Sequence, residues 1–164
     1  MSGKILAVDY GRVRIGLAVS DPDRKFAFPL LVYVPQKPGC GGVALLPESQ
    51  PDSDGAFFRK LVREERIAAL VVGLPVRTSG EEDQMAREVR RFSAWLTSVT
   101  GLPVVHFDER FTSVLAESLL WEAGLTHAKR KQRRDKVAAQ ILLQTYLEAG
   151  CPPESAAGPL ETPS

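Results

Sequence analysis

Three acidic residues stand where the sequence predicts the ends of secondary-structure elements. Asp9 ends a short apolar run, Glu109 comes shortly after a second apolar run, and Asp135 lies in a helical segment. Burying a carboxylate is costly unless a partner compensates its charge. Carboxylate oxygens are also the ligands that Mg²⁺ and Mn²⁺ prefer. If the three side chains converge, they could hold two divalent ions that activate a water and stabilise the leaving oxygen of a phosphodiester.

Each acid also has a simpler interpretation. Asp9 could cap the turn of a hairpin, and Asp108-Glu109-Arg110 could be a surface loop with its own ion pair. Asp135 could be stabilised by the positive end of a helix dipole, if it lies in the first turn. Asp135 is the most informative of the three, because helical spacing puts it on a face that is expected to pack inward. That face also carries Ala139, Leu142 and Tyr146.

A run of cations surrounds Asp135. Six of the eight residues 129–136 are basic: Lys129, Arg130, Lys131, Arg133, Arg134 and Lys136. Charge runs are usually solvated faces, but cations at the start of a helix oppose its dipole unless a polyanion offsets them. The run therefore predicts contacts to nucleic-acid phosphates with little sequence readout. Further cations could extend this patch, namely Arg12, Arg14, Arg77 and Arg110.

The spacing of apolar residues predicts the elements that position these side chains. Residues 5–10, 14–20 and 26–34 predict three strands, the first two as a hairpin, and Pro29 places the third at a sheet edge or a bulge. Further strands are expected over 67–72 and 102–107. Helices are expected from about residue 54, from a capping box of Ser79 and Glu82 to Gly101, over 112–122 and over 132–149. The fold class is then α/β, a five-stranded mixed sheet with antiparallel and then parallel strands, flanked by helices.

Length and composition favour one globular domain. The chain has 164 residues, 44% of them apolar and 25% charged, with a net charge of +1. We expect one domain over residues 1–150, a loop insertion at about 35–55 and a disordered tail over 151–164. No apolar stretch approaches the ~20 residues that span a bilayer, no signal peptide is visible, and the two cysteines lack metal-ligand spacing. These features predict a cytoplasmic protein without membrane partners.

Several segments together resemble the YqgF family. They are Ala7-Val8-Asp9-Tyr10-Gly11 with Arg14-Ile15-Gly16, Val72-Gly73-Leu74-Pro75, Asp108-Glu109-Arg110 with Thr112-Ser113, and Asp135-Lys136-Val137-Ala138-Ala139. YqgF proteins are bacterial nucleases of the RNase H-like superfamily, associated with Holliday junction resolution and with pre-16S ribosomal RNA processing. The resemblance, over about residues 4–149, implies an RNase H-like fold. It also implies that Asp9, Glu109 and Asp135 are metal-binding catalytic acids.

The sequence leaves several functions open. The leading hypothesis is a nuclease that uses Mg²⁺ or Mn²⁺ on structured nucleic acid, first of all pre-16S ribosomal RNA. A resolvase of four-way DNA junctions would need a symmetric dimer to cut two strands, and a homodimer stays open. An Asp-x-Gly hairpin also begins actin-like ATPases, but these need two such domains, and no P-loop is present. A non-catalytic binding module would bind nucleic acid in a salt-dependent, metal-independent way.

Overall fold

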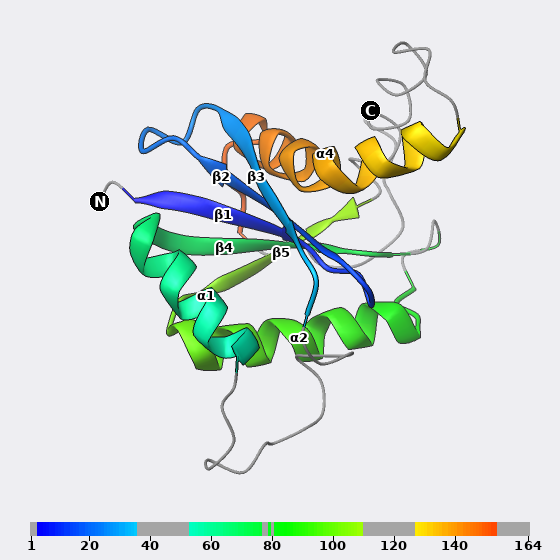
Figure 1. Ribbon diagram of the computed structural model, residues 1–164, viewed down its shortest axis with the longest axis horizontal. Helices are drawn as coiled ribbons and strands as arrows, with labels where there is room; N and C mark the ends of the chain where they lie inside the picture. Colours follow the sequence, from blue (N-terminus) through cyan, green and yellow to red (C-terminus); the bar gives the residue numbers. More distant parts are fainter. Residues whose placement is uncertain (1–2, 36–52, 77–78, 80, 110–126, 154–164) are drawn as a thin grey trace.

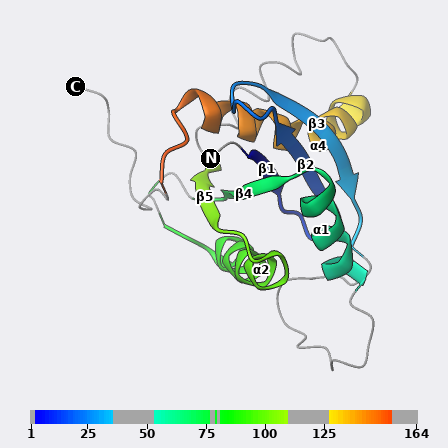
Figure 2. The same ribbon diagram turned by 90° about the vertical axis from the view of Figure 1, so that its left-hand side faces the viewer.

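Strands and helices alternate along most of the chain after an initial group of three strands. The computed structural model describes residues 3–35, 53–76, 79, 81–109 and 127–153, without the side chains of 53 and 127–136. Its strands are β1 (Lys4–Asp9), β2 (Ile15–Ser20), β3 (Ala27–Tyr33), β4 (Ile67–Leu74) and β5 (Val104–Asp108). The helices are α1 (Ser53–Glu64), α2 (Gln84–Thr100) and α4 (His127–Glu148). Figures 1 and 2 show the sheet between α4 on one face and α1 with α2 on the other.

The five strands form one mixed sheet in the order β3-β2-β1-β4-β5. β1 pairs antiparallel with β2 and parallel with β4, and β4 pairs parallel with β5. The predicted fold class is therefore confirmed. β3 lies at the edge, and its pairing with β2 shifts register next to Pro29, which suits a residue that cannot donate to the ladder. Because β1, β4 and β5 are parallel, their carboxyl ends meet at one end of the sheet.

Two apolar layers cover the two faces of the sheet. Side chains of a strand alternate between faces, so Leu6 and Val8 pack toward α1 and α2, whereas Ile5 and Ala7 pack toward α4. Asp9 has the parity of Ala7 and therefore belongs to the α4 face. The inward face predicted for the last helix is confirmed, since Ala139, Leu142 and Tyr146 are all buried.

The capping box predicted for α2 is wrong. Oδ1 of Asp83 accepts hydrogen bonds from the backbone N–H groups of Met85 at 3.0 Å and Ala86 at 3.3 Å, so Asp83 is the N-cap. Glu82 instead pairs with Arg90, with 2.5 Å between Oε1 and Nε. Ser and Asp satisfy the free amides of a helix start equally well. The nearer of the two capping residues is the one used here.

Replacing Asp83 tests this N-cap. We expect Asp83→Ala to lower the free energy of unfolding by about 1 kcal/mol, because two amides at the helix start lose their acceptor. Ser79→Ala is the matched control and should leave stability unchanged. If the capping box were formed, Ser79→Ala would lower stability more than Asp83→Ala. Urea unfolding followed by circular dichroism measures both variants.

The last helix starts earlier than predicted. α4 begins at His127 rather than near residue 132, so Asp135 lies in its third turn. A helix dipole acts mainly within the first turn. The dipole therefore does not account for an acid at position 135.

Some sequence predictions lie outside the described residues. These are most of the loop at about 35–55, the helix over 112–122 and the tail from residue 154. The helix expected from about residue 54 begins at Ser53. In the part of the chain that the structure describes, no helix is long and apolar enough to cross a membrane.

Candidate active site

Two of the three predicted acids meet at the carboxyl ends of the parallel strands. Asp9 is the last residue of β1, and Glu109 follows β5 directly. In the register of the sheet, Val8 pairs with Val72 and Gly73 pairs with Phe107. Asp9 and Glu109 therefore flank Gly73 of β4, and strand alternation puts Asp9 and Gly73 on the α4 face.

The carboxylate of Glu109 lies directly over Gly73. A Cβ atom at Gly73 would be 2.5 Å from Oε1 of Glu109, closer than real Cβ contacts come, and 3.0 Å from its Cγ. The Glu109 side chain thus occupies the space that any other residue at position 73 would fill. From there it makes a side-chain hydrogen bond with Asp9.

This pair of carboxyl groups is electrostatically unusual. Burial raises the pKa of Glu109 to about 8, together with the charge of Asp9, the hydrogen bond with Asp9 and the charge of Asp108. Like charges at one site cannot both ionise cheaply, so the pair retains a proton near neutral pH. A bound cation would remove that repulsion, and an all-oxygen donor set suits Mg²⁺ or Mn²⁺.

Asp108 does not join the pair as a third ligand. Its side chain is buried, and its parity along β5 puts it on the opposite face of the sheet, toward α2. Among the described residues, no three acidic, histidine or cysteine side chains lie close enough together to hold a metal ion.

The third predicted acid, Asp135, lies on α4. It is one helical turn before Ala139, which is buried against the sheet. In Figure 1, α4 begins on the right, the side toward which the β5 arrow points. The side chain of Asp135 lies outside the described residues, so its part in the site stays a prediction.

Comparison with known proteins agrees with this arrangement of motifs. The sequence model of RuvX, described as "Holliday junction resolvase", matches residues 3–149. The chain belongs to the RuvX family. The resemblance to YqgF proteins is thereby confirmed, since both names refer to one family. The residues that match the RuvX model include every strand and helix described above.

Relatives of this RuvX-family chain carry the name "Putative pre-16S rRNA nuclease". One from Rhodopirellula baltica is 46% identical over 148 residues, which cover 90% of this chain and 78% of that protein. One from Maridesulfovibrio salexigens is 38% identical over 144 residues, with 88% and 97% covered. A solved structure of Thermus thermophilus RuvC with a Holliday junction substrate matches with a TM-score of 0.48 and 18% identity, covering 96% and 99% of the chains.

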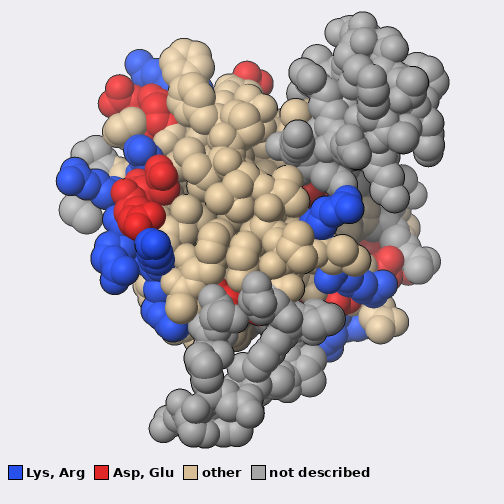
Figure 3. All heavy atoms as spheres, viewed as in Figure 1, with Lys and Arg blue, Asp and Glu red and all other residues tan. Residues whose placement is uncertain are grey.

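The predicted phosphate-binding cations of this RuvX-family chain are only partly described. Arg12 pairs with Glu88 on α2, with 3.0 Å between Nε and Oε2, and Arg14 is exposed in the turn between β1 and β2. Arg77, Arg110 and the side chains of 129–136 lie outside the described residues. In Figure 3, the described Lys and Arg side chains form separate groups mixed with Asp and Glu. The basic patch therefore stays a prediction.

Sequence reasoning did not single out Gly73 as part of the site. The available signal was a glycine within the apolar run Ile67–Leu74, where it weakens a strand and marks a close approach. The residue that approaches, Glu109, is 36 positions away. No local pattern could have identified it.

Replacing Gly73 by Ala tests this close approach. The three atoms nearest to the added Cβ all belong to the flexible Glu109 side chain, so we expect the fold to persist and the carboxylate to move by about 1 Å. A displacement of that size can reduce catalysis about 10²-fold. Cleavage rates and thermal unfolding measure the two effects, and a fully active Gly73→Ala protein would contradict the assignment of Glu109.

Proposed function

We propose that this chain is a metal-dependent nuclease that hydrolyses phosphodiester bonds of structured nucleic acid, with pre-16S ribosomal RNA as its substrate. The observation that carries the proposal is the hydrogen-bonded pair of Asp9 and Glu109 at the carboxyl ends of parallel strands. Membership of the RuvX family and the names of its relatives support the activity. The predicted cytoplasmic location belongs to the same proposal, since ribosomal RNA matures in that compartment.

Asp9, Glu109 and Asp135 are the residues that would hold the metal, Mg²⁺ or Mn²⁺. A divalent cation supplies a Lewis acid for the negative charge that develops on the phosphate, and two cations are the arrangement that suits in-line hydrolysis. The chain contributes the positioning. Asp9 is held at the end of β1 by its pairing with Gly16 of β2, and Gly73 lets the Glu109 carboxylate reach Asp9.

The predicted cations have a separate task, which is to hold the sugar-phosphate backbone of the substrate. Lys and Arg at 129–136 would do so from α4, and Arg12, Arg14, Arg77 and Arg110 from the loops around the strand ends. Contacts to phosphate position a nucleic acid without reading its sequence. Structure in the substrate would then decide where it is bound.

A four-way DNA junction is the second candidate substrate, because the family is described as a Holliday junction resolvase. Symmetric cutting of two strands would call for a homodimer. The proposed chemistry at Asp9 and Glu109 is the same for both substrates. The two candidates therefore differ in substrate shape and in assembly.

One cleavage assay separates these functions. Purified protein is incubated with a labelled pre-16S RNA fragment, an unstructured RNA, a four-way DNA junction and a linear duplex, each with Mn²⁺, Mg²⁺ or EDTA. We expect cleavage of the pre-16S fragment with metal and none with EDTA. Cleavage of the junction alone would make four-way DNA the substrate in place of pre-16S RNA. Binding without cleavage in every condition would favour a non-catalytic binding module.

A further inference from the structure

One carboxylate on α2 holds two residues of the turn that follows Asp9. The Tyr10 hydroxyl donates a hydrogen bond to Oε1 of Glu88 at 2.9 Å, and Arg12 Nε donates to Oε2 at 3.0 Å. Burial alone would raise the pKa of Glu88, but the hydrogen bonds from Tyr10 and Arg12 and the charge of Arg12 hold it below its usual value. Glu88 is therefore ionised and uses both oxygens to bind this turn.

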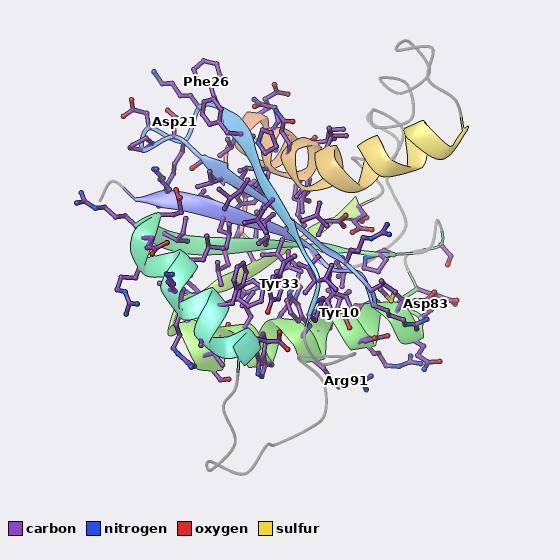
Figure 4. The ribbon with its side chains drawn as sticks, in the orientation of Figure 1. Tyr10, Asp21, Phe26, Tyr33, Asp83 and Arg91 are labelled. Carbon is purple, nitrogen blue, oxygen red and sulfur yellow. The ribbon has the colours of Figure 1, made fainter. Side chains whose placement is uncertain are left out.

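The backbone between these contacts has little freedom. The Tyr10 ring is buried and lies 4.6 Å from the Phe92 ring of α2, centroid to centroid. A Cβ at Gly11 would be 2.5 Å from the Arg14 carbonyl oxygen, so the turn is folded closely on itself. Figure 4 shows Tyr10 between the end of β1 and α2. The Arg12 side chain therefore extends from a closely packed turn.

The guanidinium of Arg12 is held on one side and exposed on the other. Glu88 engages Nε, while 60% of the Arg12 side chain is exposed, against 17% for Glu88. Among the described residues, Arg12 pairs with Glu88 alone. A guanidinium has five N–H donors in a planar fork, and no described residue is paired with the four donors on its two terminal nitrogens, which can bind a phosphate.

We infer that Glu88 is a positioning residue, which orients Arg12 so that its terminal nitrogens bind a phosphate of the nucleic-acid substrate beside Asp9. Arg12 is three residues after Asp9, so their Cα atoms are at most about 11 Å apart. An arginine that is oriented in advance loses less rotamer entropy when it binds. The inference rests on the proposed nuclease function and adds a phosphate-holding unit to that site.

If Glu88 contributed only its negative charge, it would lower the affinity for nucleic acid instead of raising it. If Glu88 only repels the substrate, Glu88→Gln removes one negative charge and strengthens binding. If Glu88 orients Arg12, Glu88→Gln weakens binding, because the guanidinium loses its charged partner. The sign of the change therefore distinguishes positioning from repulsion.

The test is equilibrium binding of a labelled pre-16S RNA fragment in EDTA, over a series of salt concentrations. We expect Arg12→Ala to weaken binding about tenfold and to reduce the slope of log K against log[salt] by about 0.7 to 0.9, as for one lost phosphate contact. Glu88→Gln should weaken binding several-fold. The double variant should bind like Arg12→Ala alone, since Glu88 acts through Arg12.

Two further variants sharpen the comparison. Arg12→Lys keeps the charge but loses the planar fork, so it should fall between wild type and Arg12→Ala. Arg63→Ala removes an exposed arginine just before β4, at the opposite end of the parallel strands, and should leave affinity and salt slope unchanged. Thermal unfolding of every variant reports whether it is folded.

The outcomes separate this inference from the proposed function. Tighter binding by Glu88→Gln, additive effects in the double variant, or an Arg12→Ala protein that binds like Arg63→Ala would each overturn the role of Glu88. In those cases metal-dependent cleavage by the wild-type protein would still support a nuclease. Absence of binding to both the RNA and the four-way DNA junction by the folded wild-type protein would overturn the inference and the proposed function together.

Discussion

Asp9→Asn should abolish metal-dependent cleavage while nucleic-acid binding persists. The substitution keeps the size of the side chain but removes one negative charge from the pair with Glu109. Loss of groups that only support metal ligands already costs 10- to 100-fold in activity or metal affinity. We therefore expect cleavage to fall by more than about 10²-fold. Single-turnover cleavage with Mn²⁺ measures the loss, and binding in EDTA should be as tight as wild type or tighter.

A matched substitution checks that the effect belongs to this position. Asp23 is an exposed acid between β2 and β3, at the amino end of β1 and thus far from the proposed site. Asp23→Asn makes the same chemical change and should cleave at the wild-type rate. Unchanged cleavage by Asp9→Asn, or an equal loss in both variants, would refute the proposed role of Asp9.

Glu109→Gln should remove a pH-dependent loss of stability that the wild-type protein has in EDTA. The pKa of Glu109 is raised from 4.5 to about 8, first by burial and then by the charge and hydrogen bond of Asp9. Between these two values the folded protein binds more protons than the unfolded chain. The free energy of unfolding therefore falls as pH rises from about 4.5 to about 8. At about 1.4 kcal/mol per pKa unit, the total loss is a few kcal/mol.

Unfolding with urea at about pH 5, 6.5 and 8 measures this difference. Relative to wild type, Glu109→Gln should gain stability as pH rises, with a plateau above about pH 8. The two carboxyl groups titrate as a pair, so the difference reports the pair and not one residue. Glu64→Gln, at an exposed position on α1, should follow the wild-type curve.

Metal binding provides a second readout for Glu109→Gln. A ligand that binds only the folded state stabilises it, so Mg²⁺ or Mn²⁺ at about pH 8 should stabilise the wild-type protein more than the variant. A stability difference that does not vary with pH would contradict the raised pKa. Equal stabilisation of both proteins by the metal would argue against Glu109 as a ligand.

Local patterns were sufficient for most of the fold. Alternating apolar residues predicted the strands, and Pro29 predicted the edge position of β3, because both are properties of short segments. The errors occurred at helix starts. Two capping sequences compete before α2, and residues 127–131 carry too few apolar side chains to show where α4 begins.

Sequence patterns were enough to predict which residues could do the chemistry and which elements carry them. Asp9, Glu109 and Asp135 were predicted as site residues from their positions at the ends of strands and on a helix face. That Asp9 and Glu109 meet beside Gly73 follows only from the parallel pairing of β1, β4 and β5. A shift of one residue in that register would reverse the face of each side chain.

The contacts that position the site are visible only in the folded chain. Glu88 lies 76 residues from Arg12 and 78 from Tyr10, and Gly73 lies under Glu109, the residue that follows β5. Such contacts depend on the packing of α2 and β5 against the ends of β1 and β4. Local propensity contains no information about that packing, because it arises only when distant segments bury their apolar faces together.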